Sequence, residues 1–289
     1  MQIRKHGTAT LSRRDLLAGL SVSAMPVIGA RSSQSDPNML QSVVPYVQET
    51  YSYAGRTQVN PATAKTGNYR AFLCWGQSQG TNVSTTPHTV TNPTKHFNVS
   101  LQNGGIYQAA DPLLSVAGTG GSIWATLGDS LITAGNYDNV IWLPVNVGST
   151  AIVEWRNNGV CVHRIRAAVS RLFALGIPAS NITILAMIGE SDANAGTSQA
   201  TMQAGFTEVR SIFDNVGLTS AMYVPLESWF SGASNSTIRA AQAAVVNGTT
   251  IKSGPDFDTL NNTNRGGGTD FNDTGVAAAA GLWKTALGF

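Results

Sequence analysis

Charged residues are scarce in this sequence. Lysine and arginine supply 18 of its 289 residues and aspartate and glutamate 16, so only 12% are charged, against about a quarter in an average globular protein. The formal net charge of +2 gives no clustered basic surface of the kind that nucleic acids or anionic membranes require. Two cysteines, Cys74 and Cys161, cannot form a disulfide framework or a zinc site by themselves. A surface of uncharged polar residues suits an exported protein or one that meets neutral polymers such as sugars.

Residues 1–31 have the pattern of an export signal. The segment from Ser12 to Leu17 reads Ser-Arg-Arg-Asp-Leu-Leu, which resembles a twin-arginine signal, and a short apolar run ending at Ala30 follows it. This run is shorter than the roughly 20 residues that a membrane-spanning helix needs. An N-terminal amphipathic helix of the folded domain is the alternative. We expect an exported protein, periplasmic or extracellular, with no membrane span in its mature form.

The rest of the sequence alternates between strand and helix patterns. Residues 32–66 are polar and contain prolines, which predicts an irregular lead-in to one domain over residues 67–289. Short apolar runs predict buried strands over residues 69–75, 140–147, 182–188 and 221–226. Helical periodicity covers residues 123–134, 162–175, 198–216, 236–246 and 273–287. This alternation indicates a parallel sheet covered by helices on both faces, with the functional site at the carboxyl ends of the strands.

A serine follows the first predicted strand directly, within the segment Gly76-Gln77-Ser78-Gln79-Gly80. Glycines permit the tight strand-to-helix turn that exposes a nucleophilic hydroxyl. An α/β-hydrolase places its catalytic histidine late in the chain, whereas the last histidine here is His163. That fold is therefore not expected. A serine that only caps a helix is the alternative interpretation.

Two glycine-containing segments lie between the first two predicted strands. Residues 118–124 form a glycine-rich loop that follows Asp111-Pro112 and opens a helix, and its backbone N–H groups could stabilise an oxyanion. A plain loop and cap is equally compatible with this pattern. Residues 128–131 spell Gly-Asp-Ser-Leu, but the helical spacing of the neighbouring apolar residues places Ser130 inside a helix. We therefore do not expect Ser130 to be a nucleophile.

Three more segments lie at the end of a predicted strand or before a predicted helix. Residues 148–155, which begin Gly-Ser-Thr, and residues 189–193, which read Gly-Glu-Ser-Asp-Ala, each follow a predicted strand. The second contains two carboxylates, Glu190 and Asp192, at the functional edge of the predicted sheet. An acidic pair that only binds backbone N–H groups at a helix N-terminus is the alternative interpretation. The last, residues 266–275, precedes the C-terminal helix and contains Asp270.

Taken together and in this order, the segments resemble the SGNH hydrolase superfamily, specifically its sialate O-acetylesterase type. The resemblance extends over residues 69–287 and implies an α/β fold, a flavodoxin-like three-layer α/β/α sandwich with a central parallel sheet. It also implies the removal of O-acetyl groups from carbohydrates, or from small esters, without a metal or other cofactor. By position it implies Ser78 as the nucleophile, Gly121 or else Gly120 as an oxyanion donor, and Gln77 and Glu190 as substrate-binding residues.

Two departures from the family pattern bear on activity. Ile188 stands where the family has a glutamine whose amide helps to hold the oxyanion, and Gly267 and Asp270 stand where it has an aspartate and its histidine base. A carboxylate is a weaker base than an imidazole. Asp270 could act alone, or His88 or His96 could fold over the site from the long loop after Ser78. The third alternative is that hydrolysis has been lost, which leaves a carbohydrate-binding protein.

We therefore predict an exported serine esterase with altered acid-base groups. Its candidate site residues Ser78, Gly121, Glu190 and Asp270 are expected to meet at one edge of the sheet, with Ser130 away from them.

Overall fold

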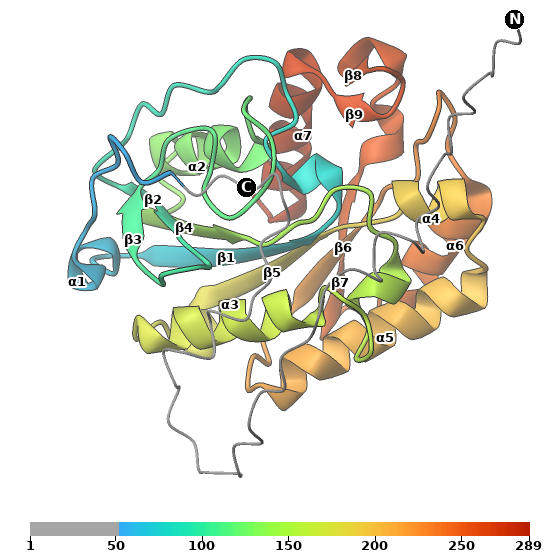
Figure 1. Cartoon of the computed structure of the whole chain (residues 1–289), viewed down its shortest axis with the longest axis horizontal. Coiled ribbons are helices and arrows are strands. Elements are labelled where there is room, and N and C mark those ends of the chain that lie inside the picture. The colour runs from blue at the N-terminus through green and yellow to red at the C-terminus, as the bar shows by residue number, and fades with distance from the viewer. Residues whose placement is uncertain (1–51) are drawn as a thin grey trace, which may run out of the picture. The chain divides into compact units, whose positions relative to one another are not determined.

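The computed structural model describes residues 52–289, and the predicted export signal lies outside them. Its centre is a seven-stranded sheet with the order β3-β2-β4-β1-β5-β6-β7 (Figure 1). Neighbouring strands are parallel except for β2 and β3, which are antiparallel. The strands are β1 (Tyr69–Gly76), β2 (His96–Val99), β3 (Ile106–Gln108), β4 (Asn139–Pro144), β5 (Ile182–Met187), β6 (Met222–Leu226) and β7 (Ile251–Asp256).

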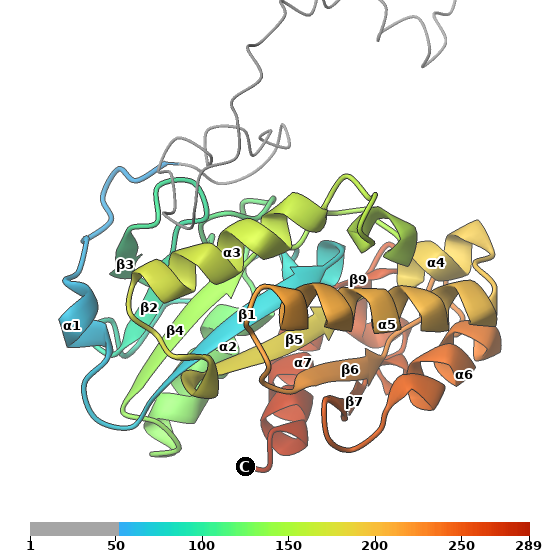
Figure 2. The ribbon, with the colours of Figure 1, turned by 90° about the horizontal axis from the view of Figure 1, so that it is seen from below.

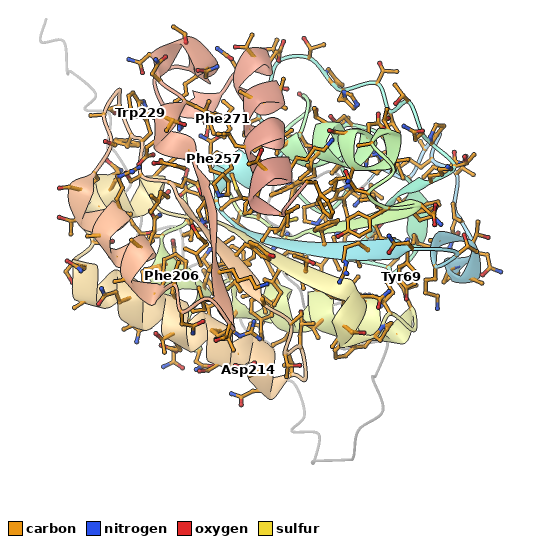
Figure 3. All side chains as sticks on the ribbon, turned by 180° about the vertical axis from the view of Figure 1, so that it is seen from behind. Tyr69, Phe206, Asp214, Trp229, Phe257 and Phe271 are labelled. Atoms are coloured by element: carbon orange, nitrogen blue, oxygen red, sulfur yellow. The ribbon has the colours of Figure 1, made fainter. Side chains whose placement is uncertain are left out.

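Helices cover both faces of this sheet (Figure 2). One face packs against α3 (Val162–Ala174), α5 (Gln199–Asn215) and α6 (Ser236–Val245). The other packs against α2 (Ile123–Thr133) and α7 (Asp273–Ala286). Figure 3 shows Phe206 on the first side of the sheet and Phe257 and Phe271 on the second. The predicted three-layer α/β/α sandwich is confirmed.

The central strand β1 explains why the first apolar run has no alternation. Its side chains point alternately into the two cores: Leu73 and Trp75 belong to the core under α3 and α5, and Phe72 and Cys74 to the core under α2 and α7. Both faces are dry, so successive residues are apolar. β4 and β5 flank β1 and bring their carboxyl ends to the same edge of the sheet.

Several short elements connect these layers. They are the helix α1 (Pro61–Ala64) within the expected lead-in, the helix α4 (Glu190–Ala195), the 3-10 turns η2 (Ser78–Gly80) and η3 (Ile152–Trp155), and the hairpin of β8 (Arg265–Gly266) and β9 (Asp270–Phe271). Within residues 52–289, no helix combines the length and apolarity that a membrane span requires. The strands β2, β3 and β7 were not predicted.

Candidate active site

Gly76 ends β1 and allows the turn that carries Ser78. Its φ is +121°, and a Cβ at this position would lie 1.9 Å from the Met187 carbonyl oxygen of β5. Only glycine permits both this backbone conformation and this close approach. The chain then turns at once into η2, and Ser78 begins that turn. The serine is therefore held at the carboxyl end of the central strand.

Ser78 meets Asp270 at this edge. The Ser78 hydroxyl donates a hydrogen bond to Asp270 Oδ1 with an Oγ–Oδ1 distance of 2.7 Å. Asp270 begins β9, directly before α7. The expected approach of these two residues is confirmed. A carboxylate in contact with a serine hydroxyl is in position to accept its proton.

A cavity of about 360 Å³ lies beside the pair. Its volume falls within the range of about 300 to 1,000 Å³ that is usual for small-molecule sites. Within the part of the chain that the structure describes, Asp270 is the only charged residue in the lining, and the others are small or polar and uncharged. The lining consists of Ser78, Thr81, Asn82, Val83, Ser84, Ala117, Gly118, Thr119, Gly120, Gly148 and Asp270.

The glycine-rich loop forms one wall of this cavity, but its predicted oxyanion donor is not available. The Gly121 N–H donates to Ser84 Oγ at 3.1 Å, and Gly121 is not among the lining residues. Gly120 lines the cavity, and its N–H is directed at the Asn82 carbonyl oxygen at 3.4 Å. The expected role of Gly121 is therefore not supported, because its N–H is already used inside the protein.

Gly148 adjoins Ser78, although its sequence pattern gave it only a place after a strand and no role. It follows β4, lines the cavity, and a Cβ built on it would lie 3.9 Å from Ser78 Cβ. Within residues 52–289, neither the Gly148 N–H nor the Ser78 N–H donates to another protein group. Ile188 is fully buried and offers no side-chain donor. The signal for Gly148 was its place after a strand, but only the strand order shows that this strand neighbours β1.

The histidines are engaged elsewhere. His88 Nε2 lies 2.8 Å from Asp129 Oδ2, and His96 Nδ1 lies 3.3 Å from Asp129 Oδ1. Burial opposes ionisation of Asp129, but hydrogen bonds from His96, the Thr91 N–H and His88 together hold its pKa well below the usual range. Neither histidine lines the cavity. The alternative in which His88 or His96 replaces the missing base is therefore not supported.

The literal Gly-Asp-Ser-Leu string is structural. Ser130 lies inside α2, as the helical spacing predicted, and it is not among the residues that line the cavity. Its neighbour Asp129 accepts the hydrogen bonds that anchor the loop of residues 88–92.

Gln77 and Glu190 lie beneath the site and not in the cavity. Each has 1% of its surface exposed. Gln77 Nε2 donates to Glu190 Oε2 at 2.6 Å, while Gln79 Nε2 and Arg265 Nη1 both donate to Glu190 Oε1 at 2.7 Å. Burial raises the pKa of Glu190, and the charge of Arg265 and the Gln79 amide oppose this rise. The three groups that contact Glu190 all donate hydrogen bonds to it, which is the environment of a carboxylate. The predicted contact of Gln77 and Glu190 with substrate is not supported.

Glu227 is a second buried carboxyl group near Glu190. It is fully buried, and neither carboxyl oxygen has a hydrogen-bond partner within the described residues. Burial, together with the Glu190 carboxylate, raises the pKa of Glu227 well above its usual range. The folded protein therefore keeps a proton on Glu227 at pH values at which an unfolded chain has lost it.

Replacing Glu227 with glutamine is expected to stabilise the protein relative to wild type, by an amount that grows as the pH rises. An unfolded glutamate ionises near pH 4.3. Above that pH the unfolded wild-type chain binds fewer protons than the folded one, so its free energy of unfolding falls until the pH passes the folded pKa. Glu227→Gln removes this loss. Its Tm relative to wild type should rise between pH 4 and pH 8, by about 2 to 4 °C for each kcal/mol.

Glu208→Gln is the control for this experiment. The Asn157 N–H and Arg156 lower the pKa of Glu208, so this variant has no such loss to remove. A Tm difference between Glu227→Gln and wild type that stays constant from pH 4 to pH 8 would contradict the assignment of a protonated Glu227.

Comparison with known proteins identifies the fold. No family model and no curated protein matches the sequence. A protein of Arabidopsis thaliana is 13% identical with a TM-score of 0.59, over 76% of this chain and 98% of that one. A carbohydrate acetylesterase from Xanthomonas citri is 15% identical with a TM-score of 0.50, over 75% of this chain and 55% of that one. A protein from Parabacteroides merdae, named for its likeness to GDSL lipases, is 10% identical with a TM-score of 0.51, over 78% of this chain and 99% of that one. The chain thus shares its three-layer α/β/α fold with these proteins.

Proposed function

We propose that this protein hydrolyses acetyl esters of uncharged carbohydrates, with Ser78 as the nucleophile and Asp270 as the general base. The observation that carries the proposal is the 2.7 Å hydrogen bond from Ser78 Oγ to Asp270 Oδ1 at the edge of a cavity. A serine whose proton is directed at a carboxylate, on the strand-to-helix turn of an esterase fold, is suited to acyl transfer.

The reaction has two steps. Asp270 accepts the proton of Ser78 as Oγ attacks the acetyl carbonyl carbon, and the same proton then passes to the departing sugar oxygen. This leaves an acetyl group on Ser78 and a free sugar hydroxyl. A water molecule then attacks the acetyl-serine, and Asp270 accepts one proton of that water and passes it to Ser78 Oγ as the acyl C–Oγ bond breaks. The product leaves as acetic acid, which ionises to acetate and a proton in solution.

Backbone groups supply the oxyanion donors in this proposal. The Ser78 and Gly148 N–H groups have no acceptor among the described residues, and the two residues adjoin at the cavity. Preorganised N–H donors stabilise the negative charge that develops on the carbonyl oxygen. One donor of this kind contributes about 10² to 10³ in kcat. With Ile188 in the place of the family's glutamine, we expect a slower enzyme than one with a third donor.

The cavity lining supports an uncharged substrate. Its hydroxyl, amide and backbone groups suit a sugar, and among the described lining residues only Val83 and Ala117 have apolar side chains that a long acyl chain could contact. The lining residues include no lysine or arginine, and the carboxylate of Asp270 repels an anion. We therefore propose a neutral acetylated sugar and not a sialate ester, in contrast to the sialate type that the sequence resembles. Twin-arginine export, proposed from residues 12–17, would bring the enzyme to such substrates outside the cytoplasm.

Acetate release from a matched set of esters tests this function. The set contains an acetylated neutral monosaccharide, an O-acetylated sialic acid, and a long-chain acyl ester of the same neutral sugar. We expect the neutral acetyl ester to have the highest kcat/KM, by about tenfold or more, because an anion beside a partly buried carboxylate is disfavoured by at least about 1.4 kcal/mol.

Two outcomes would contradict the proposal. Equal rates on the neutral and sialate esters would refute the substrate class and leave the esterase activity. Binding of the neutral sugar without any release of acetate would refute the esterase activity itself.

A further inference from the structure

The hairpin that carries Asp270 is weak by itself. β8 and β9 have two residues each, joined by Gly267-Gly268-Thr269. A two-stranded hairpin is marginally stable at best in water, and glycines lower its stability further. Backbone pairing alone therefore does not explain why Asp270 Oδ1 is held 2.7 Å from Ser78 Oγ. Side chains must fix the hairpin to the turn after β1.

Gln79 makes this connection. It directly follows Ser78, and its side chain is fully buried. Gln79 Oε1 accepts a hydrogen bond from the Phe271 N–H at 3.0 Å, and Gln79 Nε2 donates to the Thr269 carbonyl oxygen at 2.9 Å. Thr269 and Phe271 are the residues on either side of Asp270. One side chain on the nucleophile turn thus holds both neighbours of the carboxylate.

Two buried charged residues keep the Gln79 amide in this orientation. Gln79 Nε2 donates to Glu190 Oε1 as well as to the Thr269 carbonyl oxygen, so a flipped amide would direct its oxygen at two acceptors. Arg265 Nη1 contacts the same two acceptors, at 2.7 Å and 2.6 Å. Its guanidinium also lies 4.6 Å from the centroid of the Phe271 ring. The Arg265–Glu190 ion pair therefore supports both Gln79 and the hairpin.

We propose that Gln79 is a positioning residue that sets the Asp270 carboxylate against Ser78. It acts by holding Thr269 and Phe271, and it touches neither substrate nor the reacting atoms. This inference rests on the proposed function, because the position of Asp270 affects the rate only if Asp270 accepts the Ser78 proton. A displacement of about 1 Å in a catalytic group can lower the rate about 10²-fold.

The adjacent glutamine provides a matched control. Gln77 is 1% exposed and also donates to Glu190, at 2.6 Å, but its Oε1 accepts from the Ser191 N–H and not from the hairpin. Gln79→Met and Gln77→Met each remove one buried hydrogen bond to Glu190, and only the first releases Asp270. We expect Gln79→Met to lower kcat about 10- to 100-fold with KM within about twofold. Gln77→Met should keep kcat within about threefold.

A double-mutant cycle separates positioning from general destabilisation. The rate at which an organophosphorus probe labels Ser78 is measured in wild type, Gln79→Met, Asp270→Asn and the double variant. If Gln79 acts through Asp270, Gln79→Met should slow labelling by less than about twofold once Asp270 is asparagine. Fully additive losses, or equal effects of Gln79→Met and Gln77→Met on kcat, would overturn the inference.

A second variant covers a failure to fold. Arg265→Lys keeps a positive charge beside Glu190 but loses the planar fork that reaches Thr269 and Phe257. Arg265→Lys should lower kcat as Gln79→Met does, with KM unchanged. In the Asp270→Asn background it should not slow probe labelling further. A labelling loss that adds to that of Asp270→Asn would contradict a positioning role. If wild type neither hydrolyses esters nor reacts with the probe, the proposed function fails. If wild type is active and Gln79→Met behaves like Gln77→Met, this inference alone fails.

Discussion

Replacing Ser78 with alanine is expected to lower kcat by about 10⁴-fold or more, because a serine enzyme without its nucleophile keeps only the assistance of binding and of the oxyanion donors. Labelling by an organophosphorus probe should be lost at the same time, since the probe needs an activated serine oxygen. Among residues 52–289 the hydroxyl makes one hydrogen bond, to Asp270, so Ser78→Ala should fold normally. Initial rates of acetate release and the mass of the labelled protein measure both effects.

Ser130→Ala is the matched control. This serine belongs to the literal Gly-Asp-Ser-Leu string but lies inside α2, away from the cavity. Its removal should leave the hydrolysis rate within about twofold and probe labelling intact, as for an ordinary surface substitution. Should Ser130→Ala and not Ser78→Ala abolish labelling, Ser78 would not be the nucleophile.

Replacing Asp270 with asparagine should lower kcat about 10²- to 10⁴-fold, the usual value of general-base assistance. The amide has nearly the shape of the carboxylate and can still contact Ser78 Oγ, but it cannot accept a proton. KM should change little, because binding of a neutral sugar does not require the charge. Asp214→Asn is the control and should retain full activity, because the exposed Asp214 lies on α5 in an i,i+4 ion pair with the buried Arg210, away from the cavity.

The pH dependence of kcat/KM distinguishes the two kinds of base. Because neither His88 nor His96 lines the cavity, we expect the rate to stay constant through the histidine range of about pH 6 to 7. A loss of rate on acidification within that range, abolished by His88→Ala, would move the base from Asp270 to His88.

The parts of the fold that sequence patterns predicted are those whose side chains face a dry core. Strands β1, β4, β5 and β6 are buried and apolar, and their ranges were predicted within a few residues. β2 is equally buried but contains His96 and Asn98. The His96 ring contacts Asp129 and accepts from the Trp142 indole N–H, and Asn98 bonds to backbone groups. β7 contains Gly254 and Pro255 and lies at the sheet edge, where a strand needs no apolar run.

The candidate site could be predicted where chemistry depends on one position and not where it depends on packing. Ser78 was found because a strand, a glycine and a serine are adjacent in the sequence. Choosing between Gly121 and Gly148 requires knowing that β4 neighbours β1 and that Ser84 accepts the Gly121 N–H. Glu190 was noticed at a strand end, but its partner Arg265 is 75 residues away, and no local pattern links them.

The hydrogen bond between Ser78 and Asp270 spans 192 residues. During synthesis, the ribosome therefore releases the turn of Ser78 and most of the cavity wall long before Asp270. Closing so long a loop costs entropy that only the nearly complete domain can offset. A nascent or truncated chain can contain Ser78 in its correct turn and remain chemically inert. Under the proposed function, ester hydrolysis would thus report that the whole domain has folded, from its first strand to its last helix.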